Sequence, residues 1–134
     1  MNPKIVRGIT WTSRILLALA FTAAAFGKLA SDPKMVAMFD KVGFGQWFRY
    51  FTGLTELSGA ILLLIPATAF WGALILVATM AGAIATHLLI IGGSPLAAIV
   101  LGVLASFAAY RLRGSATGSA REQTQRQTGV SYSR

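Results

Sequence analysis

The chain has 134 residues and a formal net charge of +8, and 55% of its residues are hydrophobic against 12% that are charged. A soluble domain of this length has too little interior to bury so much apolar sequence, which excludes an ordinary soluble globular protein. The absence of cysteine excludes disulfides, thiolate nucleophiles and cysteine-ligated metal or iron–sulfur sites.

The first apolar segment covers residues 9–30. Its charge-free stretch between Arg14 and Lys28 is too short for a bilayer core of about 30 Å. One or both of these side chains must therefore lie inside the span, with the stem directed toward the membrane surface. We expect a transmembrane helix here. A cleavable signal peptide is the alternative, because small residues at Ala23 and Ala25 follow an apolar middle.

The connector over residues 31–50 predicts a short helix. Asp32 followed by Pro33 is typical of a helix start, with an N-cap acceptor before a proline in the first turn. Gly43 predicts the end of this helix. An aromatic cluster follows, made of Phe44, Trp47, Phe48 and Tyr50. We expect a helix in the membrane interface that forms a lid on the bundle, with a partner-binding site as the alternative.

Three further apolar segments cover residues 50–66, 70–91 and 95–111. Pro66 ends the first of them, and the Gly92-Gly93-Ser94-Pro95 turn separates the other two. Small residues spaced four apart permit close helix contact in lipid. Such pairs are Ala20 and Ala24, Ala81 and Ala85, Gly82 and Thr86, and Gly102 and Ser106.

These segments predict an all-α, polytopic membrane protein: a four-transmembrane-helix bundle with a short interfacial helix between its first two spans. The membrane domain covers residues 1–111. Residues 112–134 are rich in Ser, Thr, Gln, Gly and Arg and have few apolar side chains. We expect a disordered basic cytoplasmic tail there, because such a composition cannot bury enough apolar surface to fold alone.

The placement of lysine and arginine predicts the orientation, because these residues accumulate on the cytoplasmic side of a membrane. Eight of the 12 precede or open the first span or follow the fourth, namely Lys4, Arg7, Arg14, Arg111, Arg113, Arg121, Arg126 and Arg134. We expect a multi-pass protein of the inner (plasma) membrane with both termini in the cytoplasm. The charge favours anionic lipid over nucleic acid as the partner, and Arg14 is expected to reach lipid phosphates.

This topology brings Lys28, Glu56 and His87 to one layer near the outer end of the bundle. A charge in hydrocarbon costs about 2.5–3.5 kcal/mol, so such residues are paired, turned toward a cavity, or functional. In a structural interpretation, Lys28 and Glu56 form a buried ion pair and His87 is a neutral imidazole that hydrogen-bonds a carbonyl or carboxylate. In a functional interpretation, the layer is a polar pocket that binds quinone carbonyls and exchanges protons. These ligands are too few for a metal site.

Hydroxyl groups in the same layer come from Thr52, Thr55, Ser58 and Thr86.

Four short motifs follow one another along the membrane domain: Arg14 with the apolar run after it, Phe26-Gly27-Lys28, Gly53-x-x-Glu56-x-x-Gly59, and Leu62-Leu63-Leu64-Ile65-Pro66. Through these motifs the chain resembles the DoxX-like family of small four-helix membrane proteins over roughly residues 10–110. The resemblance marks six family-pattern positions: Arg14, Gly27, Lys28, Gly53, Glu56 and Gly59.

Members of that family are typically bacterial. Some are subunits of thiosulfate:quinone oxidoreductase and others are linked to membrane oxidoreductase assemblies. The resemblance therefore implies a non-catalytic membrane subunit of a quinone-linked redox assembly, with quinone as the candidate cofactor and a redox enzyme subunit as the candidate partner. The missing cysteines leave no thiol for sulfur relay. A stand-alone small-molecule binder or transporter and a purely structural membrane protein are the alternatives, and the oligomeric state stays open.

Overall fold

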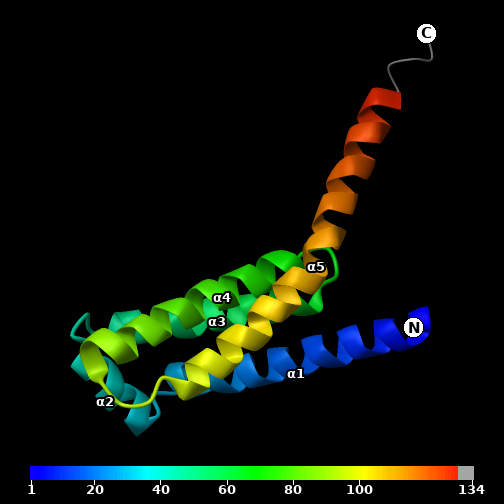
Figure 1. Cartoon of the computed structure of the whole chain (residues 1–134). Coiled ribbons are helices and arrows are strands. Elements are labelled where there is room, and N and C mark those ends of the chain that lie inside the picture. Colours follow the sequence, from blue (N-terminus) through cyan, green and yellow to red (C-terminus); the bar gives the residue numbers. More distant parts are fainter. Residues whose placement is uncertain (130–134) are drawn as a thin grey trace.

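The computed structural model describes residues 1–129. In this range the chain forms helices only, which confirms the prediction of an all-α protein. Their order is α1 (Pro3–Leu29), α2 (Pro33–Val42), α3 (Gln46–Leu64), α4 (Ala69–Thr86), the π-helix η1 (His87–Ile91) and α5 (Leu96–Gly129). The chain starts at one end of the bundle, and α5 leaves the bundle at that same end (Figure 1).

Within the described residues, three helices are long and apolar enough to cross a membrane, which confirms a membrane protein. They are α1, α4 continued by η1, and α5, and they match three of the four predicted spans. The helix at the second predicted span, 50–66, is α3, which has 19 residues and is not one of the three. It carries Arg49 and Glu56, which lower its hydropathy. A membrane crossing by α3 therefore stays a prediction.

The local signals around α2 are confirmed. The Asp32 side chain accepts a hydrogen bond from the Lys34 amide at 2.9 Å, and Pro33 opens the helix. Gly43 ends it in the left-handed conformation, with φ at 82°, where a glycine has no Cβ penalty. This short helix covers one end of the bundle, where it contacts α1, α3 and η1 (Figure 1). Its location in a membrane interface stays a prediction.

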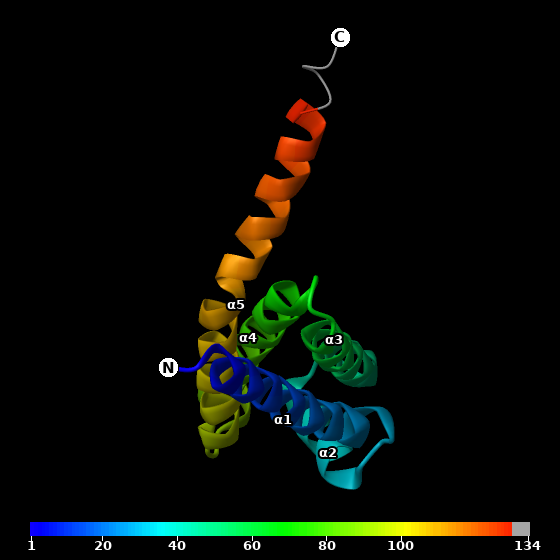
Figure 2. The ribbon, with the colours of Figure 1, turned by 90° about the vertical axis from the view of Figure 1, so that its right-hand side faces the viewer.

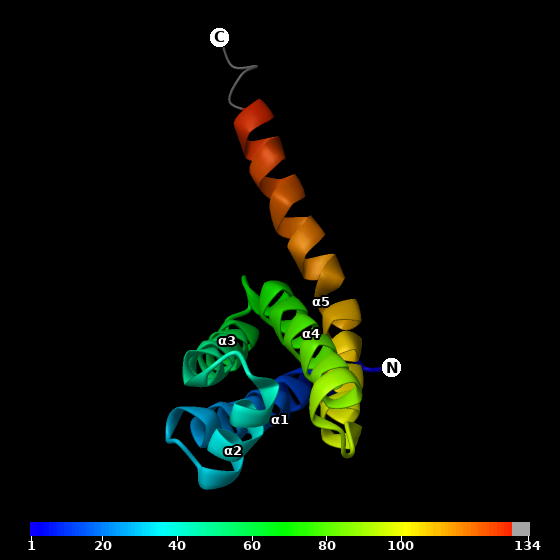
Figure 3. The ribbon, with the colours of Figure 1, turned by 90° about the vertical axis from the view of Figure 1, so that its left-hand side faces the viewer.

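The bundle is closed by three extensive helix contacts and one slight one. Packing runs from α1 to α3, from α3 to α4 and from α4 to α5, whereas α1 touches α5 only weakly. The two side views show α4 between α3 and α5 (Figure 2 and Figure 3). The fully buried apolar side chains that fill the interior include Phe21, Leu63 and Leu76. The seam between α1 and α5 is therefore the least tightly closed side of the bundle.

Two glycines let α3 and α4 approach closely. A Cβ atom on Gly72 would lie 2.6 Å from the Leu63 nitrogen and 2.7 Å from the Gly59 oxygen. One on Gly59 would lie 2.7 Å from Leu76 Cδ2. The predicted small-residue contacts are only partly found: Gly102 packs against Met80, whereas Gly82 has no neighbour within 4 Å of an added Cβ. The close contact at Gly72 was not foreseen from spacing.

The second half of α5 extends away from the bundle as a helix (Figure 1). This differs from the predicted disordered tail over residues 112–129, while residues 130–134 of that tail lie outside the described part of the chain. The helix continues because α5 is already nucleated in the bundle, and each further residue then adds a backbone hydrogen bond without a new nucleation cost. An exposed ion pair between Glu122 and Arg126, four residues apart, adds slight support.

Candidate functional site

The predicted pair of Lys28 and Glu56 is present as a direct ion pair between α1 and α3. The Lys28 ammonium donates to both carboxylate oxygens of Glu56, at 2.8 Å to Oε2 and 3.1 Å to Oε1. Glu56 is only 2% exposed, and the Lys28 side chain is 15% exposed. Both oxygens of the carboxylate thus have a charged donor, which is how a buried carboxylate is kept in an apolar interior.

Arg49 on α3 extends this ion pair into a network. It is 2% exposed, and its Nη1 donates to the backbone oxygen of Lys28. Its Nη2 donates to Ser31 Oγ at 3.1 Å and its Nε to Gln46 Oε1 at 2.6 Å. The guanidinium also lies over the Tyr50 ring, with 4.3 Å from Cζ to the ring centroid, in a cation–π contact. Its planar set of donors therefore binds the end of α1 to the start of α3.

Arg49 is a site residue that the sequence motifs did not reveal. Its signal was its spacing from Glu56, because positions seven apart share one face of a helix. The buried face of α3 follows this spacing through Arg49, Gly53, Glu56, Gly59, Ala60 and Leu63. Because it shares this face with a buried carboxylate, Arg49 was itself a candidate for burial.

His87 lies at the same end of the bundle but outside this network. It is the first residue of η1, and η1 packs against α2, which in turn contacts α3. Its Nδ1 lies 2.9 Å from the backbone oxygen of Ala83, one turn earlier on its own helix. Among residues 1–129, no hydrogen bond or ion pair joins His87 to Lys28 or Glu56, and no partner is found for its Nε2. The imidazole is half-buried.

The hydroxyl groups predicted for this layer are engaged with their own helices. Thr55, Ser58 and Thr86 each donate to the carbonyl oxygen four residues earlier, and Thr52 donates to that of Arg49. The part of the chain that the structure describes has no cluster of three or more His, Cys, Asp or Glu side chains suited to a metal ion. The layer is thus an ion-pair network beside a separate histidine.

The predicted aromatic cluster forms between α2 and α3 and includes two further rings, those of Phe39 and Phe51. Phe48 is its centre, with ring centroids 5.4 Å from Phe44, 5.7 Å from Trp47, 6.0 Å from Phe39 and 6.2 Å from Phe51. These contacts join α2 to α3, and edge-on and tilted geometries of this kind are favourable for aromatic pairs. Tyr50 belongs instead to the Arg49 network, where its hydroxyl lies 3.3 Å from Ser31 Oγ.

Arg14 occupies the other end of the α1–α3 interface, about 21 Å along α1 from Lys28. It is 5% exposed, and its Nε donates to the backbone oxygen of Leu63 at 2.8 Å. Its guanidinium lies 4.3 Å from the Trp11 ring centroid. Sequence reasoning expected a side chain that reaches lipid phosphates at the membrane surface. The structure directs Nε to the end of α3, where backbone carbonyls lack helical partners, and contact of the guanidinium with lipid phosphates stays a prediction.

The family-pattern glycines have different environments. Gly53 faces α1 at the ion pair, where an added Cβ would lie 3.1 Å from Leu29 Cγ and 3.2 Å from Lys28 Cβ. Gly59 faces α4 at the close contact described above. Gly27 has more room, since the nearest side chain to an added Cβ would be Met35 at 4.0 Å. Gly53 and Gly59 thus lie at close helix contacts, whereas Gly27 does not.

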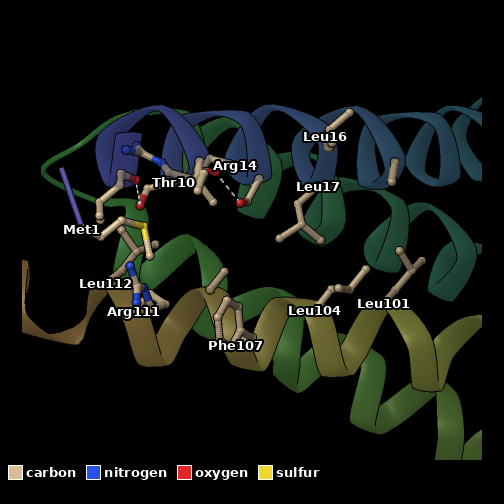
Figure 4. A pocket seen from close by; sticks show the side chains of 15 residues that line it. Met1, Thr10, Arg14, Leu16, Leu17, Leu101, Leu104, Phe107, Arg111 and Leu112 are labelled. Carbon is tan, nitrogen blue, oxygen red and sulfur yellow. Dashed lines mark hydrogen bonds between the residues drawn. The ribbon is translucent and has the colours of Figure 1, made fainter. Parts of the chain in front are cut away.

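A cavity of about 510 Å³ lies in the α1–α5 seam, at the end of the bundle opposite to α2. Figure 4 shows it between the two helices, with Arg111 and Leu112 toward one end and Leu101 and Leu104 toward the other. Its walls are mostly apolar, and Arg14 also lines it. This groove was not foreseen from the sequence, because it depends on how weakly α1 and α5 pack together.

Comparisons with known proteins identify a family. No curated protein and no solved structure matches the chain. The sequence model of the DoxX-like family matches residues 12–110, which include Arg14, Lys28 and Glu56. Because this match covers most of the chain, including its buried charged positions, the chain belongs to the DoxX-like family of membrane proteins.

Proposed function

We propose that the chain is a non-catalytic membrane subunit of a quinone-linked redox assembly in a bacterial inner membrane. The observation that carries the non-catalytic role is the network in which the Lys28 ammonium pairs with Glu56 and the Arg49 guanidinium binds the backbone oxygen of Lys28 at the end of α1. Glu56 is 2% exposed and both of its oxygens already accept from the Lys28 ammonium, so the carboxylate presents no open face to a substrate. Such a network holds helices in place rather than carrying out a reaction.

The same arrangement supports a membrane crossing by α3. Its 19 residues span about 28 Å, close to the thickness of a bilayer core. Glu56 is paired with Lys28, and Arg49 binds the end of α1, so each charge on this helix has a partner. Ionisable residues inside membranes are tolerated when they are paired in this way. With α3 included, the four crossings put both termini on the cytoplasmic side by the distribution of arginine and lysine.

His87 supports the quinone link. It lies at the same end of the bundle as the ion-pair network, is half-buried, and uses Nδ1 for a contact with its own helix. Because the Ala83 oxygen can only accept, Nδ1 carries the proton and Nε2 of the neutral imidazole is an acceptor for the hydroxyl of a quinol at the membrane edge. Once it has taken up that proton, Nε2 can donate to a quinone oxygen. It stands at the start of η1, and π-helical turns inside helices occur frequently at functional sites. The redox partner itself is inferred from the family resemblance.

Co-purification tests this function. The full-length chain, carrying a purification tag, is extracted from bacterial membranes with a mild detergent, and bound quinone and co-eluting proteins are identified by mass spectrometry. We expect quinone and an oxidoreductase subunit with the wild type. His87→Gln should lower the amount of bound quinone about tenfold, because the hydrogen bond between the imidazole and the quinone is lost. The partner protein should be retained.

Gly82→Ala is the matched control, because it changes the same helix at a position with no neighbour within 4 Å of the new methyl group. It should retain both quinone and partner. The proposed function is contradicted if the wild type carries no more quinone and no more oxidoreductase subunit than an unrelated membrane protein of similar size purified in parallel.

One observation favours a second candidate function, a stand-alone binder of small apolar molecules. The groove between α1 and α5 has a volume of about 510 Å³, which is within the range of ligand sites, and its walls are largely apolar. A wild-type protein that carries a stoichiometric apolar molecule other than a phospholipid, but no partner protein, would favour this function over the first.

A further inference from the structure

The groove between α1 and α5 has the shape of a site for one lipid chain. Its lining residues on α1 extend from Val6 to Ala20 and those on α5 from Leu101 to Leu112. The stretch on α5 is about 17 Å long, close to the roughly 15 Å of one leaflet of the hydrocarbon core. Leu17, Leu101 and Leu104 give its deeper part an apolar wall (Figure 4).

The opposite end of the groove is basic and has unused hydrogen-bond donors. Arg14 is 5% exposed, and its Nη2 is buried without a hydrogen-bond partner among the described residues. A buried donor without an acceptor is costly, and the cost is higher for a charged group. Arg111 lines the same end and is exposed. Two guanidinium groups at one end of an apolar groove are complementary to a phosphate group that is joined to an acyl chain.

We propose that this groove is a specific binding site for an anionic phospholipid. Its phosphate group accepts hydrogen bonds from Arg14 and Arg111, and one acyl chain fills the α1–α5 seam along Leu17, Leu101 and Leu104. The basic end lies where the N-terminus and the exit of α5 meet, so the lipid belongs to the leaflet on that side. Lipid binding in this groove depends on the chain lying in a membrane, but it does not depend on the redox role proposed above.

Two pairs of variants separate the groove from general surface charge and surface apolarity. Arg111→Gln removes a groove cation, whereas Arg113→Gln removes a neighbouring cation that lies over Tyr110 and does not line the groove. Ala20→Phe places a ring in the groove from an exposed position on α1. Ala23→Phe places the same ring at an exposed α1 position outside the groove. Because all four positions are exposed, these variants should fold, whereas Arg14→Gln removes a buried contact.

The experiment is native mass spectrometry of the delipidated full-length protein, titrated with dioleoyl-phosphatidylglycerol or dioleoyl-phosphatidylcholine. We expect one phosphatidylglycerol per chain, bound about tenfold more tightly than phosphatidylcholine, which is the effect of one charge-assisted hydrogen bond. Arg111→Gln and Ala20→Phe should each weaken this binding about tenfold. Their controls, Arg113→Gln and Ala23→Phe, should bind as the wild type does.

Three results would overturn the proposal. Equal binding of the two lipids would show that the groove does not recognise an anionic headgroup. Equal losses in the groove variants and their controls would show that binding reflects the general charge or apolarity of the surface. A dimer that excludes lipid and that Ala20→Phe dissociates would show that a second copy of the chain occupies the seam.

Discussion

Among residues 1–129, each buried arginine binds a backbone oxygen on another helix. Arg14 of α1 donates to the Leu63 oxygen near the end of α3, and Arg49 of α3 donates to the Lys28 oxygen near the end of α1. The last carbonyl groups of a helix lack helical partners and carry the negative end of the helix dipole, so an arginine is well suited to bind them. The two helices are antiparallel neighbours, and each therefore caps the other.

Arg49→Lys should destabilise the protein by about 1.5–3 kcal/mol, the contribution of hydrogen bonds to charged groups. A lysine ammonium has no planar fork and cannot serve the Lys28 oxygen, Ser31 and Gln46 together. The measurement is the free energy of unfolding in mixed micelles titrated with sodium dodecyl sulfate. Lys41→Ala on the exposed side of α2 is the control and should change it by less than about 0.5 kcal/mol. Equal stability of Arg49→Lys and the wild type would contradict the capping role.

At the scale of the elements, the α3–α4 contact depends on the absence of a side chain at Gly72. Gly72→Ala would place a methyl group 2.6 Å from the Leu63 backbone nitrogen, and backbone atoms cannot move aside as a flexible side chain can. We expect a loss of about 1–3 kcal/mol, typical of overpacking. Gly82→Ala, with open space around it, should be neutral or slightly stabilising when both are measured by the same unfolding titration. Similar effects of the two substitutions would contradict this account of the contact.

Local features of the fold could be predicted from sequence, whereas contacts between helices could be predicted only in part. The ends of α2 follow from Asp32, Pro33 and Gly43 because capping depends on a few adjacent residues. The Lys28–Glu56 pair was foreseen because the hairpin topology limits the depth of each residue. The burial of Arg49, the direction of Arg14 and the α1–α5 groove depend on how each helix is rotated about its axis, which no local pattern specifies.

At the scale of the whole molecule, the number of membrane crossings determines which side each loop faces. The absence of cysteine makes this testable, since an introduced cysteine is the only thiol in the chain. Single-cysteine variants are made at the exposed positions Ala37 on α2, Ala67 between α3 and α4, and Ala120 on α5. In intact cells a membrane-impermeant maleimide should label the first from outside, whereas the other two should react only after permeabilisation. Labelling of Ala37→Cys and Ala67→Cys from the same side would contradict a crossing by α3.

We conclude that the charged residues at the α2 end hold α1 against α3. A double-mutant cycle with Lys28→Met, Glu56→Leu and the double variant tests it by the free energy of unfolding in mixed micelles. Each single substitution leaves one buried charge without its partner and should cost about 3–5 kcal/mol, whereas the double variant should recover most of that loss. Losses that simply add in the double variant, or single variants as stable as the wild type, would contradict the claim.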